Sequence, residues 1–143
     1  MVIKLRVECV WGTYLAEECV RIIAMEDSAS LLDLHEVIQD AVSFDRDHLF
    51  DFYTANSPSR SASKNWVSCA EDWDEKVEAL EATQLRDIWP LRRKKLYYLF
   101  DWGDNWLFEI RKIRSSEADQ SIACPCVLEE IGPNPQQYPR YDE

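Results

Sequence analysis

The segment from Asp101 to Trp106, DWGDNW, combines side chains that could bind a cation with those of a tight turn. It holds two carboxylates, an amide and two tryptophans, and the apolar runs LYYLF and LFEIRKI flank it. Glycine takes a positive φ at no steric cost, and Asp and Asn bond to nearby backbone, so the segment is typical of a β-hairpin turn. We predict that the turn presents a binding surface made of Trp102, Gly103, Asp104, Asn105 and Trp106. A positive φ at Gly103 would make Gly103→Ala cost about 1 kcal/mol or more.

The two histidines of the chain offer an alternative chemistry. His35 falls on the apolar side of a predicted helix, and His48 begins the strand that follows. If the fold brought His35, His48 and Asp104 together, they could hold a metal ion for a hydrolase or nuclease-like reaction. However, DWGDNW lacks the ligand spacing of an EF-hand, and a histidine on an apolar helix face is more often packed in the core. The metal-dependent enzyme is therefore the alternative prediction, and no cofactor is expected.

The cysteines indicate the compartment. Their number is odd and their spacing irregular, unlike the even framework of a small secreted domain. Cys124-Pro-Cys126 could supply two thiolates to zinc, but no second Cys or His pair stands at the spacing of a zinc finger. We expect reduced thiols in a cytoplasmic protein. The five are Cys9, Cys19, Cys69, Cys124 and Cys126.

The charge balance limits the class of partner. The chain has 27 acidic and 16 basic side chains, and its formal net charge of −11 repels nucleic-acid phosphate and anionic lipid at long range. The one concentrated basic run, LRRKK at 91–95, is interpreted as charge that protects a sheet edge. No apolar run is long enough to span a bilayer, and phosphate-loop and dinucleotide motifs are absent from the sequence. We expect no membrane contact and, overall, no nucleic-acid contact, although LRRKK with Tyr97 and Tyr98 could stack on bases or bind an acidic partner.

Periodicity predicts the elements that must position these residues. Alternation from Ile3 to Cys9 predicts a strand that forms an antiparallel hairpin with a second strand at 18–25. Ser28 or Ser30 can cap a helix that runs to about Ser43 and has one apolar face. Further strands are expected at 48–55, 65–70, 95–100 and 106–113, with Thr83 capping a short helix.

Two segments differ from the rest in composition. The polar stretch 56–64, NSPSRSASK, has no apolar anchor and is expected to be a loop tip. After Ser115 the chain turns to Ser, Pro, Gln and Tyr. We therefore predict a single domain at 1–115 and a C-terminal extension or surface-docked tail at 116–143.

Three segments carry a resemblance to a known family. LLDLHEVIQDAV at 31–42, DHLFDF at 47–52 and YLFDWGDNWLFEI at 98–110 resemble, in order and spacing, the plasmid pRiA4b ORF-3-like family, also called the passenger TnpR family of an insertion element. The resemblance covers about residues 2–113, and the closing IGPNPQQYPRY is similar to the tail of one branch. The family's frequent Pro-Pro-x-Trp-Arg segment is absent here, and Phe108 stands where family members often have histidine. This departure weakens the metal-site prediction.

The resemblance implies a fold but no established reaction. It implies a compact α+β domain with a mixed, mainly antiparallel sheet and one main helix packed on one face. The implied order is ββαββ(α)ββ, in a β-grasp-like layout, and the mobile-element label reflects gene neighbourhoods. We therefore expect a non-catalytic protein-interaction module that presents the DWGDNW turn and the tail to a protein partner. The partner's identity and the oligomeric state stay open.

Overall fold

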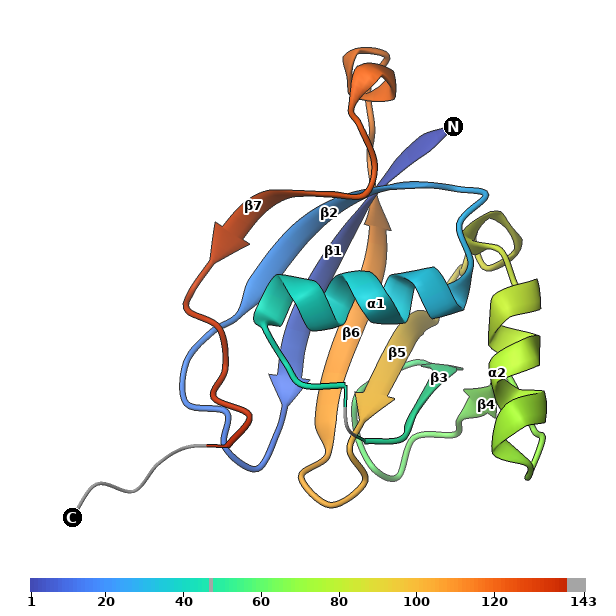
Figure 1. Ribbon diagram of the computed structural model, residues 1–143, viewed down its shortest axis with the longest axis vertical. Coiled ribbons are helices and arrows are strands. Elements are labelled where there is room, and N and C mark those ends of the chain that lie inside the picture. Colours follow the sequence, from blue (N-terminus) through green and yellow to red (C-terminus); the bar gives the residue numbers. More distant parts are fainter. Residues whose placement is uncertain (47, 139–143) are drawn as a thin grey trace.

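The computed structural model describes residues 1–46 and 48–138, which form one large sheet with a long helix across one face (Figure 1). The predicted α+β class is confirmed, since these described residues form two α-helices and a seven-stranded sheet. The strands are β1 (Val2–Trp11), β2 (Val20–Glu26), β3 (Phe50–Ala55), β4 (Asn65–Trp66), β5 (Lys95–Phe100), β6 (Trp106–Ile113) and β7 (Cys126–Ile131). The helices are α1 (Leu31–Val42) and α2 (Trp73–Ala82), with the short 3₁₀ turns η1 (Leu85–Asp87) and η2 (Ala118–Ser121).

The sheet order is β4-β3-β5-β6-β1-β2-β7, and every pairing between described strands is antiparallel. The expectation of a mixed sheet is therefore wrong for the described strands. The two helical connections, from β2 to β3 and from β4 to β5, do join strands that run in the same direction. Other strands of the sheet lie between each such pair, so no parallel ladder forms.

The elements with strong local signals lie where the sequence predicts them. Ser30 caps α1, and it forms a reciprocal capping box with Asp33. β5 and β6 occupy 95–100 and 106–113 and pair as a hairpin around the predicted turn. Thr83 is an exception: it ends α2, where its hydroxyl donates to the carbonyl of Ala79, and Gln84 precedes η1. The predicted cap is therefore wrong.

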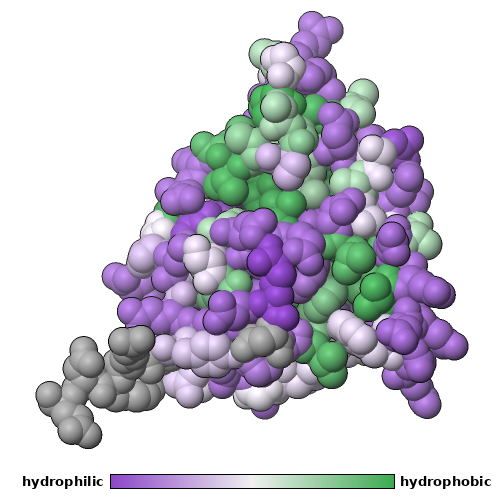
Figure 2. All heavy atoms as spheres, in the orientation of Figure 1, coloured by the Kyte–Doolittle hydropathy of each residue, from purple (hydrophilic) through white to green (hydrophobic). Residues whose placement is uncertain are grey.

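The main core lies between α1 and the inner face of the sheet. The helix buries its apolar stripe, Leu31, Leu34 and Ile38, against alternate residues of the strands. Its outer side carries polar residues, and Figure 2 shows this face of the molecule with a hydrophilic band across α1. Trp106, the largest fully buried side chain, packs under the β1–β2 connection. A Cβ added at Gly12 would lie 2.2 Å from its ring, so only glycine fits there.

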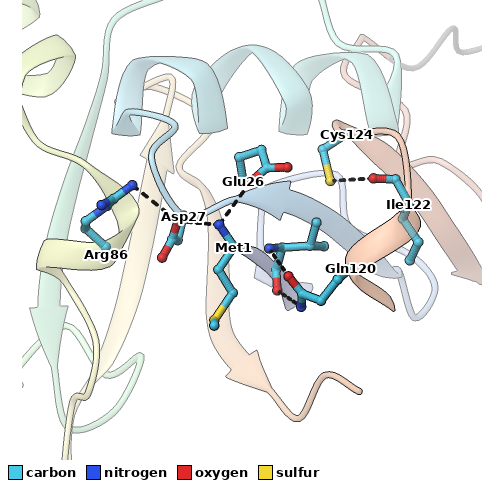
Figure 3. Close-up of polar contacts among 8 residues, drawn as sticks. Met1, Glu26, Asp27, Arg86, Gln120, Ile122 and Cys124 are labelled. Atoms are coloured by element: carbon cyan, nitrogen blue, oxygen red, sulfur yellow. Dashed lines mark hydrogen bonds and ion pairs between the residues drawn. The ribbon is translucent and has the colours of Figure 1, made fainter. Parts of the chain in front are cut away.

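The segment after Ser115 is docked on the domain over its described residues. Gln120 of η2 accepts from the backbone N–H of Val2 and donates to the carbonyl of Val2 (Figure 3). β7 then pairs with β2 and becomes the outermost strand on that side. Figure 3 also shows the amino group of Met1 between Glu26 and Asp27. The division at 115/116 stays a prediction, and residues 139–143 of the predicted tail lie outside the described residues.

Arg21 joins this docked segment to α1. Its side chain is only 1% exposed. The guanidinium donates to the carbonyls of Ala41, at the end of α1, and of Ile131 and Gly132, and to Oδ1 of Asn134. No carboxylate of the described residues pairs with it, so backbone dipoles at the helix C-terminus compensate its charge.

Candidate functional site

The predicted turn divides between the core and the surface. Trp106 is completely buried and packs against Phe44, so it cannot belong to the predicted binding surface. Trp102 is 48% exposed. The positive φ values belong to Asp101 (62°) and Asn105 (52°), whereas Gly103 has none. The conformational prediction for Gly103 is therefore wrong. The turn uses the tolerance of Asp and Asn for the left-handed region instead.

Asp101 organises the turn and faces His48. Its Oδ1 accepts from the backbone N–H groups of Gly103 at 3.0 Å and Asp104 at 3.3 Å, and its Oδ2 lies 3.4 Å from Nε2 of His48. The hydroxyl of Tyr138 also contacts Nε2 of His48. Burial, together with the nearby charge of Asp101, raises the pKa of Asp104. Two of the predicted metal candidates, His48 and Asp104, therefore lie around one carboxylate.

His35 lies in the core, stacked on Phe50 with ring centroids 3.6 Å apart. Gln39 donates to the hydroxyl oxygen of Tyr98, and this hydroxyl lies 2.5 Å from Nδ1 of His35. Tyr98 O–H thus donates to a neutral imidazole. Burial lowers the pKa of His35 to about 4, with Glu36 opposing the change and Arg46 adding to it. Residues 1–46 and 48–138 hold no group of three His, Cys, Asp or Glu side chains placed for a metal ion. The metal-dependent enzyme stays a prediction.

A cleft of about 550 Å³ lies on the outer face of the sheet, opposite α1. Its floor comes from side chains that alternate with core residues along β3, β5 and β6, namely Tyr53, Leu99 and Leu107. Because β5 and β6 separate β3 from β1, the cleft spans roughly 14 Å of sheet. The full lining is Trp11, Tyr53, Pro58, Ser59, Arg60, Lys64, Trp66, Leu99, Trp102, Asn105 and Leu107.

Three tryptophans surround this floor. Trp11 at the end of β1 is 43% exposed, and Trp102 projects from the hairpin turn. The ring of Trp66 on β4 lies 5.7 Å from that of Trp102 and 4.9 Å from that of Tyr53. Trp102 and Asn105 are therefore the members of the predicted surface that line the cleft.

The loop at 56–64 borders the cleft and supplies its cations. Arg60 lies over the ring of Trp11, 5.4 Å from its centroid, and Lys64 lies 5.7 Å from the ring of Tyr53. Lys64 also donates to the carbonyls of Arg60 and Ala62. Ala62 packs against the buried side chains of the outer face of the sheet, which are Tyr53, Ala55, Tyr97 and Leu107. The prediction that this loop has no apolar anchor is wrong, because the outer face of the sheet anchors it.

The other basic run is not at a sheet edge. LRRKK at 91–95 leads into β5, which lies between β3 and β6. Lys95 and Arg111 pair with the buried carboxylate of Glu109, which also accepts from the hydroxyl of Tyr97. The interpretation as edge protection is therefore wrong, since β5 has a neighbour on each side. Of this run, Lys95 is the residue that pairs with the buried acid among the described residues.

One signal for the cleft was present in the sequence. LYYLF and WLF are continuous apolar runs, and FDFY is interrupted only by Asp51; strands show such runs when both of their faces are covered. The charge alternation of β1 differs, since Lys4, Arg6 and Glu8 mark a face open to water. The runs predict cover on both faces of β3, β5 and β6, although they do not say that a cleft remains.

An antiparallel sheet with a helix on one face and an aromatic cleft on the other defines this chain as a two-sided α+β domain. The chain belongs to the plasmid pRiA4b ORF-3-like protein family, whose profile matches residues 3–137. The resemblance seen in the three sequence segments is thereby confirmed, and the match extends through β7.

A solved structure supports the fold. The crystal structure of the protein of unknown function MM3350 from Methanosarcina mazei Go1 is similar, with a TM-score of 0.65 and 22% sequence identity. The match covers 90% of this chain and 68% of that chain. At this identity the likeness shows the fold alone. No curated protein matches the chain. Among the described residues, no helix has the length and apolar character to cross a membrane.

Proposed function

We propose that this protein is a non-catalytic binding module that takes an extended segment of a protein partner into the outer-face cleft. The observation that carries the proposal is the pair of half-exposed tryptophans, Trp11 and Trp102, on opposite sides of an apolar floor. Large aromatic side chains that border a concave surface are the usual anchors of protein interfaces. The proposed binding surface therefore includes Trp102 and Asn105 of the predicted turn, together with the neighbouring outer face of the sheet.

The chemistry of the lining favours binding over catalysis. The polar side chains among its described residues are Ser59, Arg60, Lys64 and Asn105. The hydroxyl of Ser59 bonds to that of Ser61, and the described residues that line the cleft include no histidine or carboxylate. A hydroxyl without a general base is a poor nucleophile. These groups can bind and orient a ligand through aromatic contacts and two cations.

The cleft has the dimensions of a peptide site. At about 3.4 Å per extended residue, a span of roughly 14 Å holds about four residues of a partner chain. Such a segment presents alternate side chains to the floor, and Leu99 and Leu107 lie there as a directly paired apolar strip. The cytoplasmic location, the mobile-element association and the β-grasp-like layout belong to the same proposal. The layout is supported by α1, which crosses one face of the sheet.

The test is selection of a random peptide library displayed on phage against the folded protein. Peptides that are enriched should bind Trp102→Ala at least about tenfold more weakly, since an anchoring tryptophan contributes about 2 kcal/mol or more. Leu128→Ala is the matched control, because Leu128 is similarly exposed, at 41%, on β7 and outside the cleft. Peptides that bind all three proteins equally would contradict the proposal.

A further inference from the structure

We infer that the segment bound in the outer-face cleft is acidic, with carboxylates beside an aliphatic side chain. This inference rests on the proposed function and adds the chemical class of the ligand. It follows from the two cations that border the cleft, from the ring faces already occupied, and from the apolar strip left between them.

The cations are available to an anion. None of the ion pairs formed by the described residues involves Arg60 or Lys64. The guanidinium of Arg60 lies over Trp11, and a stacked guanidinium keeps its in-plane N–H donors free for a carboxylate. Lys64 has three N–H donors and gives two of them to carbonyls of its own loop. In a chain of net charge −11, this cleft brings together over apolar surface two cations that pair with no carboxylate of the described residues.

Each aromatic ring of the cleft already contacts another ring or a cation of the protein, which disfavours stacking of a nucleotide base. Tyr53 stacks on Tyr97 with ring centroids 5.3 Å apart, and Lys64 lies over its ring. Arg60 lies over Trp11, and Trp66 is tilted against both Tyr53 and Trp102. A base needs an open ring face on which to stack. The surface between the rings is the paired strip of Leu99 and Leu107, which suits an aliphatic side chain.

The net charge of the chain does not prevent this selection. At physiological ionic strength the Debye length is about 8 Å, so distant carboxylates are largely screened from a ligand in the cleft. Arg60 and Lys64 would lie within contact distance of it, over apolar surface where charges interact more strongly than in water. The repulsion instead disfavours long polyanions, which would extend beyond the cleft. A short acidic segment fits both conditions.

The experiment uses the same displayed library with charge variants of the full chain. Wild type should enrich peptides that combine Asp or Glu with Leu, Ile or Val. Arg60→Gln and Lys64→Gln should each weaken the enriched peptides about fivefold, and added salt should weaken their binding to wild type. The double variant Arg60→Glu/Lys64→Glu should enrich basic peptides. Lys94→Gln, an exposed cation outside the cleft, is the control and should leave binding unchanged.

The other outcomes separate this inference from the proposed function. Enriched peptides that are neutral or basic, yet depend on Trp102, would overturn the acidic class and leave the binding module standing. The absence of any peptide that depends on Trp102 would overturn both. Displacement of a selected peptide by adenosine monophosphate at lower concentration than by a free acidic peptide would overturn the peptide ligand in favour of an aromatic phosphate.

Discussion

Substitution of His35 by Gln tests how the buried imidazole contributes to stability. His35 accepts from Tyr98 O–H and stacks on Phe50, while Gln39 holds the same hydroxyl from its other side. Gln keeps a polar end but loses the stacking. We expect His35→Gln to lower the free energy of unfolding at pH 7 by about 1 to 2 kcal/mol.

The pH dependence gives the sharper signature. Burial lowers the pKa of His35 to about 4 in the folded protein, against about 6.5 when unfolded. Between pH 6.5 and pH 4, His35 is therefore protonated in the unfolded chain but neutral in the folded protein. The free energy of unfolding thus decreases as the pH falls through this range. Linkage over this window gives a loss of about 2 kcal/mol between pH 7 and pH 5 from this residue alone. Gln does not titrate, so the variant lacks this loss.

The assay is urea denaturation of both proteins at a series of pH values between 7 and 5. All other ionisable groups are the same in the two proteins, so the difference between the two curves isolates His35. The destabilisation of the variant seen at pH 7 should shrink as the pH falls and disappear, or change sign, near pH 5. A difference that stays constant across the series would show that His35 titrates alike in both states, and the burial argument would fail.

Further experiments test packing and metal chemistry. Gly12→Ala should destabilise the protein by about 1 to 3 kcal/mol in urea, because the new Cβ would meet the ring of Trp106 at 2.2 Å. Gly103→Ala, whose Cβ would meet only Oδ1 of Asp101 at 3.3 Å, should cost less; equal losses would contradict the packing argument. Elemental analysis of protein purified without added metal should find no stoichiometric metal ion. A bound metal that is lost in both His48→Ala and Asp104→Ala would favour the hydrolase instead.

The secondary-structure elements that the sequence predicts correctly are those determined by interactions between residues close together in the chain. The capping box at Ser30 and Asp33 and the turn chemistry of DWGDNW involve residues three to five positions apart. Their hydrogen bonds form within the segment, so α1 and the β5–β6 hairpin lie where periodicity placed them. β7 differs, since its sequence shows no alternation that marks a strand. Its backbone is paired only because β2 offers an open edge.

The different burial of the two turn tryptophans shows what only the tertiary structure decided. Trp102 and Trp106 have the same side chain, but Trp106 begins a strand at a position that faces α1, whereas Trp102 projects from the turn. The cleft depends on contacts still farther apart in the sequence: Trp11, Arg60 and Trp102 meet only because β1 lies beside β6 and the 56–64 loop folds over the outer face. The sequence by itself determined the local elements, because backbone hydrogen bonds and caps act over a few residues. The tertiary structure decided which aromatic side chains were buried and which formed a site, because strand order is set by the packing of the whole sheet.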